Sequence, residues 1–194
     1  MDGEKLLDNL AVQVSRIFHP FVLAIPTGML LLYLAELSIV ESVKWVLLSA
    51  AVTILPTTLF MRFHPDYRLR DINSREKRNL LYLIAVTELI ILTGLSYLLN
   101  APETVMVYLY SAVILTSVGA LINRFSKISL HVGFLSSFST AVSFLSIQLG
   151  ALFYAMTLTT AWSRLRMDRH TFRQLLLGVF IPIICIGPIF YFLL

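Results

Sequence analysis

One uncharged stretch decides the fold of this chain, Val132-GFLSSFSTAVSFLSIQLGALFYAMTLTTAW-Ser163, which is 32 residues long. As a single helix it would measure about 48 Å, whereas the hydrocarbon core of a bilayer is about 30 Å thick. Gln148 and Gly150 are typical of a turn between helices. The stretch therefore predicts two helices that turn near Ser146–Gly150.

The rest of the chain has the composition of a membrane protein. Of its 194 residues, 58% are hydrophobic and only 13% are charged, whereas charged residues make up about 25% of a soluble domain. Further apolar stretches approach the ~17–25 residues that one crossing needs. These stretches are Phe21–Ala35, Trp45–Met61, Asn79–Leu99, Val105–Asn123 and Leu175–Leu194. The sequence therefore predicts an all-α, polytopic integral membrane bundle of about six to seven transmembrane helices, forming a single domain over residues 1–194.

The first residues differ from these stretches because polar residues separate their apolar ones. Leu6, Leu10, Val14 and Ile17 recur at helical spacing before Pro20. An apolar stripe on an otherwise polar helix is typical of a helix that lies on a membrane surface. We therefore expect a short interfacial helix over residues 1–17.

The distribution of positive charge favours seven crossings. With seven, 14 of the 15 Lys and Arg residues lie on one face of the membrane and only Lys44 lies on the other. If residues 132–163 formed one long helix, the arginines after Ser163 would move to the opposite face. The positive-inside rule assigns the basic face to the cytoplasm. We therefore expect a multi-pass protein of the cell membrane whose C-terminus lies on the non-cytoplasmic side.

Three basic clusters stand at helix ends, and the last is the richest: Ser163-Arg164-Leu-Arg-Met-Asp-Arg169-His170-Thr-Phe-Arg173-Gln174. His170 and Gln174 are one helical turn apart, so the Gln side chain can reach the imidazole. An arginine fork such as that of Arg164 suits phosphate, and a neutral imidazole is a competent nucleophile or base. The alternative is a set of snorkelling arginines beside an interfacial histidine.

The second cluster reads Lys127-Ile-Ser129-Leu-His131. Ser129 can cap a helix that begins near His131, where free backbone N–H groups attract an anion. Lys127 adds positive charge at the same place. A capped interfacial helix without a ligand explains the pattern nearly as well.

The first cluster reads Asp71-Ile-Asn-Ser-Arg75-Glu-Lys77-Arg78. Arg75 and Arg78 lie one turn apart on the face that enters the next span, and Asp71 can orient either of them. Taken alone, such a cluster is more often a topology determinant than a binding site.

Taken together, the clusters resemble the signatures of the type 2 phosphatidic acid phosphatase superfamily. These are membrane lipid phosphatases related to acid phosphatases and vanadium haloperoxidases, with the signatures K-x6-R-P, P-S-G-H and S-R-x5-H-x3-D. Here Arg78-Asn79 takes the place of R-P, and residues 128–131 take that of P-S-G-H. Ser163-Arg164, His170 and Gln174 take that of the last signature. The resemblance covers residues 66–180 and is closest to divergent prokaryotic members that read D-x3-R-x2-R, K-I-S-x-H and R-x5-H-T-x2-Q.

The resemblance implies a membrane phosphatase core over residues 66–180 and a role for each cluster. His170 would attack phosphorus and form a phosphohistidine, Gln174 would orient it, and His131 would protonate the leaving oxygen. The phosphate would be held by the cluster residues Arg78, Arg164, Ser129 and Lys127 or Arg75. The implied substrate is a membrane lipid or isoprenoid phosphate, such as a polyprenyl phosphate or diphosphate or phosphatidate. No metal, organic cofactor or nucleic-acid partner is implied.

Gln174 also supports a second hypothesis. The family has an Asp at this position, and a Gln carbonyl can accept the Nδ1–H of an imidazole without stabilising a full positive charge. The analogous loss of charge in a serine protease costs roughly 10⁴ in rate. An inactive protein that binds an anionic lipid head group, or transfer of the phosphoryl group to another alcohol, therefore stays open. A channel is disfavoured because polar residues do not recur along several spans.

Glu88 lies near the middle of the stretch Asn79–Leu99. An acid at that depth is costly unless it faces the bundle interior and finds a partner. We expect a hydrogen bond to a Ser, Thr or Tyr, and both a structural and a functional role are open.

Overall fold

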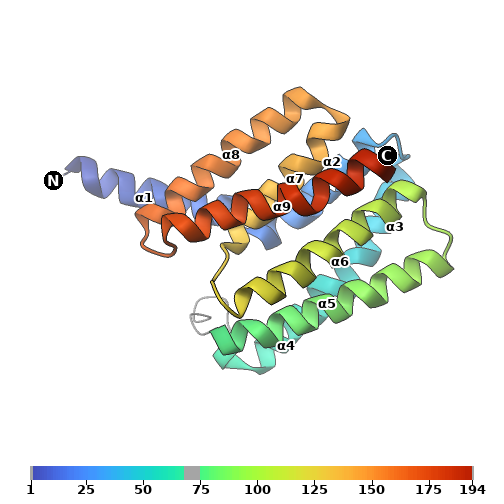
Figure 1. The fold of residues 1–194 in the computed structure, drawn as a ribbon, viewed down its shortest axis with the longest axis horizontal. Coiled ribbons are helices and arrows are strands. Elements are labelled where there is room, and N and C mark those ends of the chain that lie inside the picture. Colours follow the sequence, from blue (N-terminus) through green and yellow to red (C-terminus); the bar gives the residue numbers. More distant parts are fainter. Residues whose placement is uncertain (1, 68–74, 194) are drawn as a thin grey trace.

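Helices dominate the computed structural model, which describes residues 2–67 and 75–193 apart from the side chains of residues 2, 75 and 76. No strand occurs within these ranges. Figure 1 shows the helices lying side by side along a common direction. In chain order the elements are α1 Asp2–Ile17, α2 Pro20–Leu34, α3 Ile39–Ser49, η1 Ala50–Ile54, α4 Leu55–Phe63, η2 Pro65–Tyr67, α5 Arg75–Leu98, α6 Glu103–Asn123, α7 Leu130–Leu145, α8 Ile147–Arg166 and α9 Phe172–Leu193. The predicted all-α architecture is therefore confirmed for the described residues.

Several helices are long and apolar enough to cross a membrane. Among the described residues there are four of them, or five if α1 and α2, which meet at an angle of 52°, form one crossing. The four are Ile39–Phe63, Lys77–Leu98, Glu103–Asn123 and Phe172–Leu193. They match four of the predicted stretches. The larger count of six to seven crossings and the surface position of α1 stay predictions.

The decisive uncharged stretch forms two helices, α7 and α8, as predicted. Ser146 separates them in an extended conformation, and its hydroxyl accepts a hydrogen bond from the Leu149 N–H at 3.4 Å. Gly150 follows because the two helices approach closely here: a Cβ at this position would lie 2.7 Å from the Cα of Ser143. The turn is therefore built by a capping serine and a glycine that leaves room for the preceding helix.

Two apolar clusters hold the bundle together. The first joins α2, α3, α5 and α6, and its buried side chains are Leu32, Trp45, Val46, Leu92, Val105, Met106 and Leu109. The second joins α6, α7 and α9, and its buried side chains are Val107, Ala141, Ile186 and Phe190. Helix α7 lies at the centre of its half of the molecule, because it contacts α2, α8 and α9.

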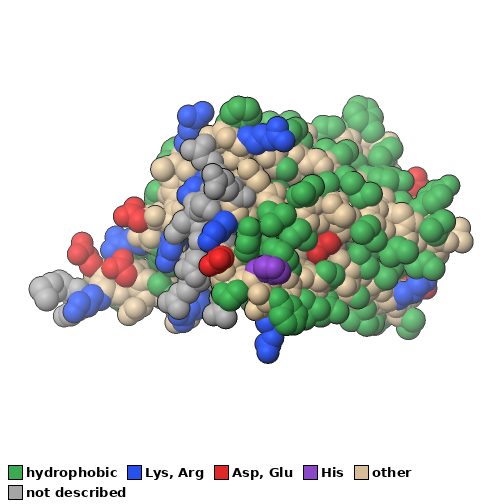
Figure 2. Space-filling model, turned by 90° about the horizontal axis from the view of Figure 1, so that it is seen from below, with side chains coloured by type: hydrophobic (Ala, Val, Ile, Leu, Met, Phe, Trp, Pro, Cys, Tyr) green, Lys and Arg blue, Asp and Glu red, His purple; other side chains and the backbone are tan. Residues whose placement is uncertain are grey.

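The basic clusters lie at one end of the bundle. The first turns of α5, α7 and α9 and the last turn of α8 all point toward the end from which α1 projects (Figure 1). Figure 2 shows Lys and Arg side chains gathered at that end, while hydrophobic side chains cover most of the rest of this face. This arrangement agrees with the predicted grouping of the clusters. The membrane and the side that this end faces stay predictions.

Candidate functional site

The third cluster forms the tight connection between α8 and α9. Asp168 adopts a left-handed backbone conformation with φ 53°, and the Arg169 N–H donates to the Arg164 carbonyl at 3.1 Å. This turn leads the chain back to the bundle, so that His170 lies just before α9. Asp168 itself is exposed. Its carboxylate is therefore not buried beside His170.

Helix α1 holds the end of α8 in place. The buried hydroxyl of Ser163 donates to the Ala11 carbonyl at 2.6 Å, and Nη1 of Arg164 donates to the Ser15 hydroxyl at 2.8 Å. Farther out, Arg166 and Asp8 form an ion pair at 2.8 Å. Asp8, Ala11 and Ser15 are spaced by three and four residues and share one face of α1. The N-terminal helix is thus part of the framework around Arg164.

Gln174 fixes the tautomer of His170. Its Oε1 lies 3.0 Å from Nδ1 of His170 and also accepts the backbone N–H of Thr171 at 3.3 Å. Because a backbone N–H can only donate, the atom facing both groups is the carbonyl oxygen. Nδ1 of a neutral His170 must then carry the proton, and Nε2 keeps its lone pair. The predicted contact between these two side chains is confirmed.

Glycine lets α9 bring His170 against the start of α7. A Cβ at Gly178 would lie 3.2 Å from the Val132 side chain and 3.3 Å from the Ser129 carbonyl. One turn farther along, the Ser136 hydroxyl donates to the Val179 carbonyl at 2.7 Å. These contacts fix α9 relative to the segment that carries His131.

The second cluster differs from its prediction in one respect. Ser129 precedes α7 in an extended conformation, but its hydroxyl makes no capping hydrogen bond. The side chain is fully buried, and its hydroxyl has no hydrogen-bond partner among the described residues. A buried hydroxyl without a partner is costly. Ser129 is therefore an available donor beside His131 and not a helix cap.

Arg78 reaches this segment from α5. Its Nη2 donates to the Ile128 carbonyl at 2.7 Å, and it also hydrogen-bonds the Tyr82 side chain. The neighbouring Asn79 accepts a hydrogen bond from Asn123 Nδ2 at 2.8 Å, which ties α5 to α6. The first and second clusters are therefore brought together. Asp71 and the side chain of Arg75, both predicted here, lie outside the described residues.

We use the name basic site for Arg78, Lys127, His131, Arg164 and His170. Burial and the positive charges of Arg164, Arg78 and Lys127 lower the pKa of His170 to about 4, although the hydrogen bond to Gln174 acts in the opposite direction. His131 also interacts electrostatically with Arg164 and His170. Residues from all three clusters thus act on one another, and His170 is neutral at pH 7.

The basic site offers donors without partners. Within the described part of the chain, the ion pairs join Lys44 to Glu41 and Arg166 to Asp8, so neither Arg78 nor Arg164 is paired with a carboxylate. Nε of Arg164 is buried and has no hydrogen-bond partner there. The Ser129 hydroxyl is in the same situation. Unpaired cations and buried donors beside a neutral imidazole suit an oxyanion.

A third histidine adjoins the basic site, and sequence reasoning assigned it no role. His19 lies between α1 and α2, and its ring is perpendicular to that of His131 with ring centroids 4.8 Å apart. Its Nδ1 accepts the Phe21 N–H at 3.3 Å and so caps α2. A histidine followed by Pro20 at the start of an apolar helix was the signal that could have identified the cap.

The predicted hydrogen bond of Glu88 is present in the structure. Glu88 accepts hydrogen bonds from the Thr57 hydroxyl at 2.9 Å with each carboxylate oxygen, as expected for an acid at membrane depth. This pair joins α4 to α5 away from the basic site. Among residues 2–67 and 75–193, no three His, Cys, Asp or Glu side chains are gathered as a metal site requires.

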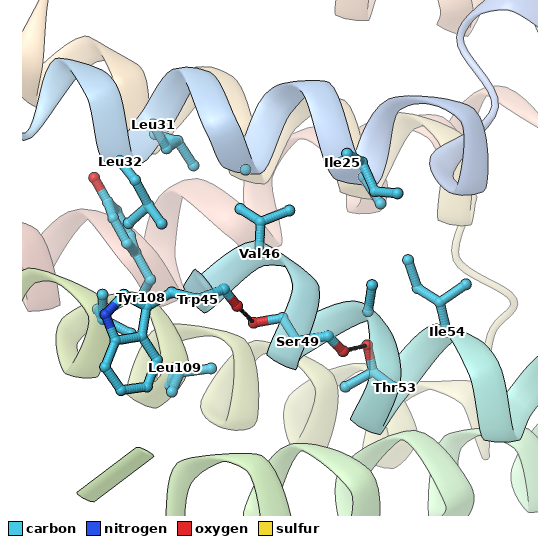
Figure 3. A pocket seen from close by; sticks show the side chains of 14 residues that line it. Ile25, Leu31, Leu32, Trp45, Val46, Ser49, Thr53, Ile54, Tyr108 and Leu109 are labelled. Atoms are coloured by element: carbon cyan, nitrogen blue, oxygen red, sulfur yellow. Dashed lines mark hydrogen bonds between the residues drawn. The ribbon is translucent and has the colours of Figure 1, made fainter. Parts of the chain in front are cut away.

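An apolar cavity of about 210 Å³ opens between α2, α3, η1 and α6. Figure 3 shows Ile25 and Leu32 of α2 facing Val46 and Trp45 of α3 across it. The hydroxyls of Ser49 and Thr53 also line the cavity, but each donates to a carbonyl of its own helix at 2.8 Å. The walls therefore present mostly hydrocarbon, together with the hydroxyl of Tyr108, which is buried and has no hydrogen-bond partner among the described residues. The cavity begins near Ala24, and so one to two turns along α2 from His19.

A comparison with protein-family models, curated proteins and solved structures finds no match to this chain.

Proposed function

We propose that the protein is a membrane lipid phosphatase that hydrolyses the phosphate or diphosphate monoester of an amphiphile through a phosphohistidine intermediate. The observation that carries the proposal is the state of His170. Its Nδ1–H is held by the Gln174 carbonyl, so its Nε2 lone pair lies among cations that have no carboxylate partner within residues 2–67 and 75–193. A neutral, oriented imidazole beside positive charge is what attack on a phosphate dianion needs.

The first step makes one bond and breaks one. Nε2 of His170 attacks phosphorus, the bond between phosphorus and the ester oxygen breaks, and protonated His131 donates its proton to the leaving oxygen. The dianionic phosphate favours the protonated form of His131 before this step. The products are the free lipid alcohol and a phosphohistidine.

The second step restores the enzyme. A water oxygen attacks phosphorus, the N–P bond returns its electron pair to Nε2, and His131 accepts the proton that the water loses. Inorganic phosphate then leaves. In both steps the side chains of Arg78, Lys127 and Arg164 stabilise the charge that spreads over the phosphoryl oxygens. The Arg164 Nε–H and the Ser129 hydroxyl, which have no partner in the part of the chain that the structure describes, supply hydrogen bonds to the same oxygens.

The apolar cavity is the site at which the lipid tail binds in this proposal. The cavity between α2, α3, η1 and α6 is apolar and has its nearer end one to two turns from His19. An isoprenoid or acyl chain in this cavity would leave the head group at the basic end of the bundle. We place that end on the cytoplasmic side of the cell membrane, because 14 of the 15 Lys and Arg residues are expected there.

Phosphate release tests the proposal directly. Purified protein is assayed with phosphatidate and farnesyl phosphate in mixed micelles, with and without orthovanadate. His170→Ala abolishes release, because no other group at the basic site provides an oriented lone pair. His64→Ala is the matched control, because His64 is exposed and its Nδ1 contacts the Phe60 carbonyl of its own helix.

Trapping of the intermediate adds a second readout. Substrate labelled at phosphorus leaves an acid-labile, alkali-stable label on the wild-type protein and on His64→Ala, and none on His170→Ala. Turnover that persists in His170→Ala would reject the phosphohistidine mechanism.

A second function is favoured by one observation, the neutral Gln174. Without a carboxylate beside His170, the same residues can serve to hold an anionic lipid head group without hydrolysing it. In that case the protein binds vanadate or lipid phosphate at the basic site, and the wild type releases no phosphate from any lipid ester. Loss of binding in Arg164→Ala together with silent wild-type protein would support this alternative.

A further inference from the structure

His19 occupies a position that joins a helix start to the basic site. It is the last residue before α2, and its Nδ1 accepts the Phe21 N–H at 3.3 Å. Its ring meets that of His131 at an angle of 90°, with centroids 4.8 Å apart. One side chain therefore makes a backbone cap on one side and a ring contact with a basic-site residue on the other.

The cap determines the tautomer of His19. Nδ1 accepts a hydrogen bond, so in the neutral ring the proton sits on Nε2. Burial, and to a lesser extent the positive charge of Arg164, lower the pKa of His19 and keep the ring neutral at pH 7. His19 therefore meets His131 as an uncharged aromatic ring.

The surroundings hold His19 in this place. Helix α1, which leads into His19, is bound to the end of α8 through the Ser163 contact with Ala11 and the Arg164 contact with Ser15. Helix α2, which leaves His19, packs against α7, the helix that carries His131. His19 is thus fixed by both of its neighbouring helices, and its ring forms a fixed wall beside His131.

We propose that His19 is a positioning residue for His131, whose imidazole packs against the His19 ring and is thereby aimed at the leaving oxygen of the substrate. The inference rests on the proposed phosphatase function, because it assigns His131 the role of general acid. His19 is given no contact with the substrate. Its effect on the reaction passes through His131.

Two substitutions separate the ring from the helix cap. His19→Asn keeps an acceptor for the Phe21 N–H, because Asn is among the best capping residues, but it removes the ring. His19→Phe keeps a flat ring beside His131 and removes the acceptor. If His19 positions His131, His19→Phe retains most of the turnover and His19→Asn does not. The opposite order would mean that His19 serves only as the cap of α2.

Two substrates separate positioning of an acid from a general structural defect. The alkoxide leaving group of phosphatidate needs a proton, whereas the phenolate of p-nitrophenyl phosphate leaves without one. In His19→Asn we expect kcat on phosphatidate to fall roughly 10- to 100-fold, which does not exceed the 10²–10⁴ that a general acid contributes. On p-nitrophenyl phosphate kcat stays within about threefold of wild type by the same reasoning, and KM is unchanged for both substrates.

A double-mutant cycle completes the test. In a His131→Ala background His19→Asn has no further effect on phosphatidate turnover, because the group that it acts through is gone. Equal losses on both substrates, or an additive loss in the double variant, overturn the positioning role while leaving the phosphatase intact. A wild-type protein that hydrolyses neither ester overturns the proposed function, and this inference with it.

Discussion

The half of the molecule built from α7, α8 and α9 differs from the half built from α3, η1, α4 and α5 in how its hydroxyl groups are used. In the first half, hydroxyls make contacts from helix to helix, several of them in addition to a bond within their own helix: Ser139 with Thr157 at 3.1 Å, Thr140 with Tyr154 at 2.7 Å, and Ser136 to the Val179 carbonyl. In the second half, hydroxyls such as those of Ser49, Thr53 and Thr93 donate to their own helix. An exception there is the Thr57 contact with Glu88.

This difference agrees with the different roles that the proposed function gives to the two halves. Small and hydroxyl-bearing residues let membrane helices approach closely and bond across the interface. The half that carries His131 and His170 therefore has the fixed geometry that placing charged groups around a phosphate requires. The other half packs by apolar contact around Trp45 and retains a cavity. This half is therefore better suited to hold a flexible lipid tail than to orient reacting groups.

The largest effect is expected at Gln174, which orients His170 in the half built from α7, α8 and α9. Gln174→Leu removes the acceptor that keeps the proton on Nδ1 of His170, so that the lone pair is no longer held on Nε2. A wrong tautomer costs about 10⁴ in kcat in a serine protease, and we expect a loss of roughly 10³–10⁴ here. The measurement is the rate of phosphohistidine formation in a single turnover.

Gln174→Glu is the matched variant, because it keeps the length and the acceptor but adds charge. A carboxylate beside His170 raises the pKa of the imidazole. The acid limb of the pH–rate profile then moves to higher pH, and the rate above that limb rises because the imidazolium-like phosphohistidine is stabilised. If Gln174→Leu turns over like the wild type, the precise geometry of this half does not serve catalysis.

The next largest effect is expected where α9 crosses α7. Gly178→Val places two methyl groups against the Val132 side chain and the Ser129 carbonyl, which already lie 3.2–3.3 Å from an added Cβ. Overpacking of this kind costs about 1–3 kcal/mol. Gly187→Val on the same helix is the control, because nothing lies within 4 Å of a Cβ there. Thermal unfolding in detergent should show a lowered Tm for Gly178→Val alone, together with loss of phosphate release.

A third prediction concerns the cavity, which α2 and α6 close against α3 and η1. Ala24→Phe fills the nearer end of the cavity, so a long tail loses burial worth about 0.8 kcal/mol for each excluded CH₂. We expect kcat/KM for farnesyl phosphate to fall about tenfold, as the exclusion of two methylenes would produce, while p-nitrophenyl phosphate is unaffected. Val22→Phe is the control, since Val22 lies on the exposed side of α2. Equal losses on both substrates would mean that the cavity does not bind the lipid tail.

Much of the fold could be predicted because a bilayer imposes a length on each apolar stretch. The predicted stretch Val105–Asn123 lies within Glu103–Asn123, and the turn in the long uncharged stretch falls at Ser146. The contact of His170 with Gln174 was predicted from helical spacing, although His170 itself lies just before α9. These features depend on residues that lie close together in the chain, and a single sequence shows such short-range patterns directly.

The remaining features depend on contacts between distant parts of the chain. Nothing near Ser163 or Arg164 indicates that they bond Ala11 and Ser15, which precede them by about 150 residues. The ring contact of His19 with His131 is equally remote. Ser129 was expected to cap α7, but α9 approaches its backbone closely at Gly178, its side chain is fully buried, and its hydroxyl has no partner among the described residues. Helical spacing cannot reveal which neighbour covers a residue.

The smallest effect is expected from removing one hydroxyl contact between helices in the half built from α7, α8 and α9. Thr157→Val keeps the shape of a fully buried side chain but removes its contact with Ser139, which joins α7 to α8. Interhelical hydrogen bonds in membrane proteins are worth about 0.6 kcal/mol on average. Thr159→Val is the control, because Thr159 is exposed and its hydroxyl donates to the Ala155 carbonyl of its own helix at 2.9 Å. Denaturant titrations in the same detergent should show a lower free energy of unfolding for Thr157→Val than for Thr159→Val. Equal values would mean that the bonds between α7 and α8 do not stiffen this half, and that its geometry comes from close packing alone.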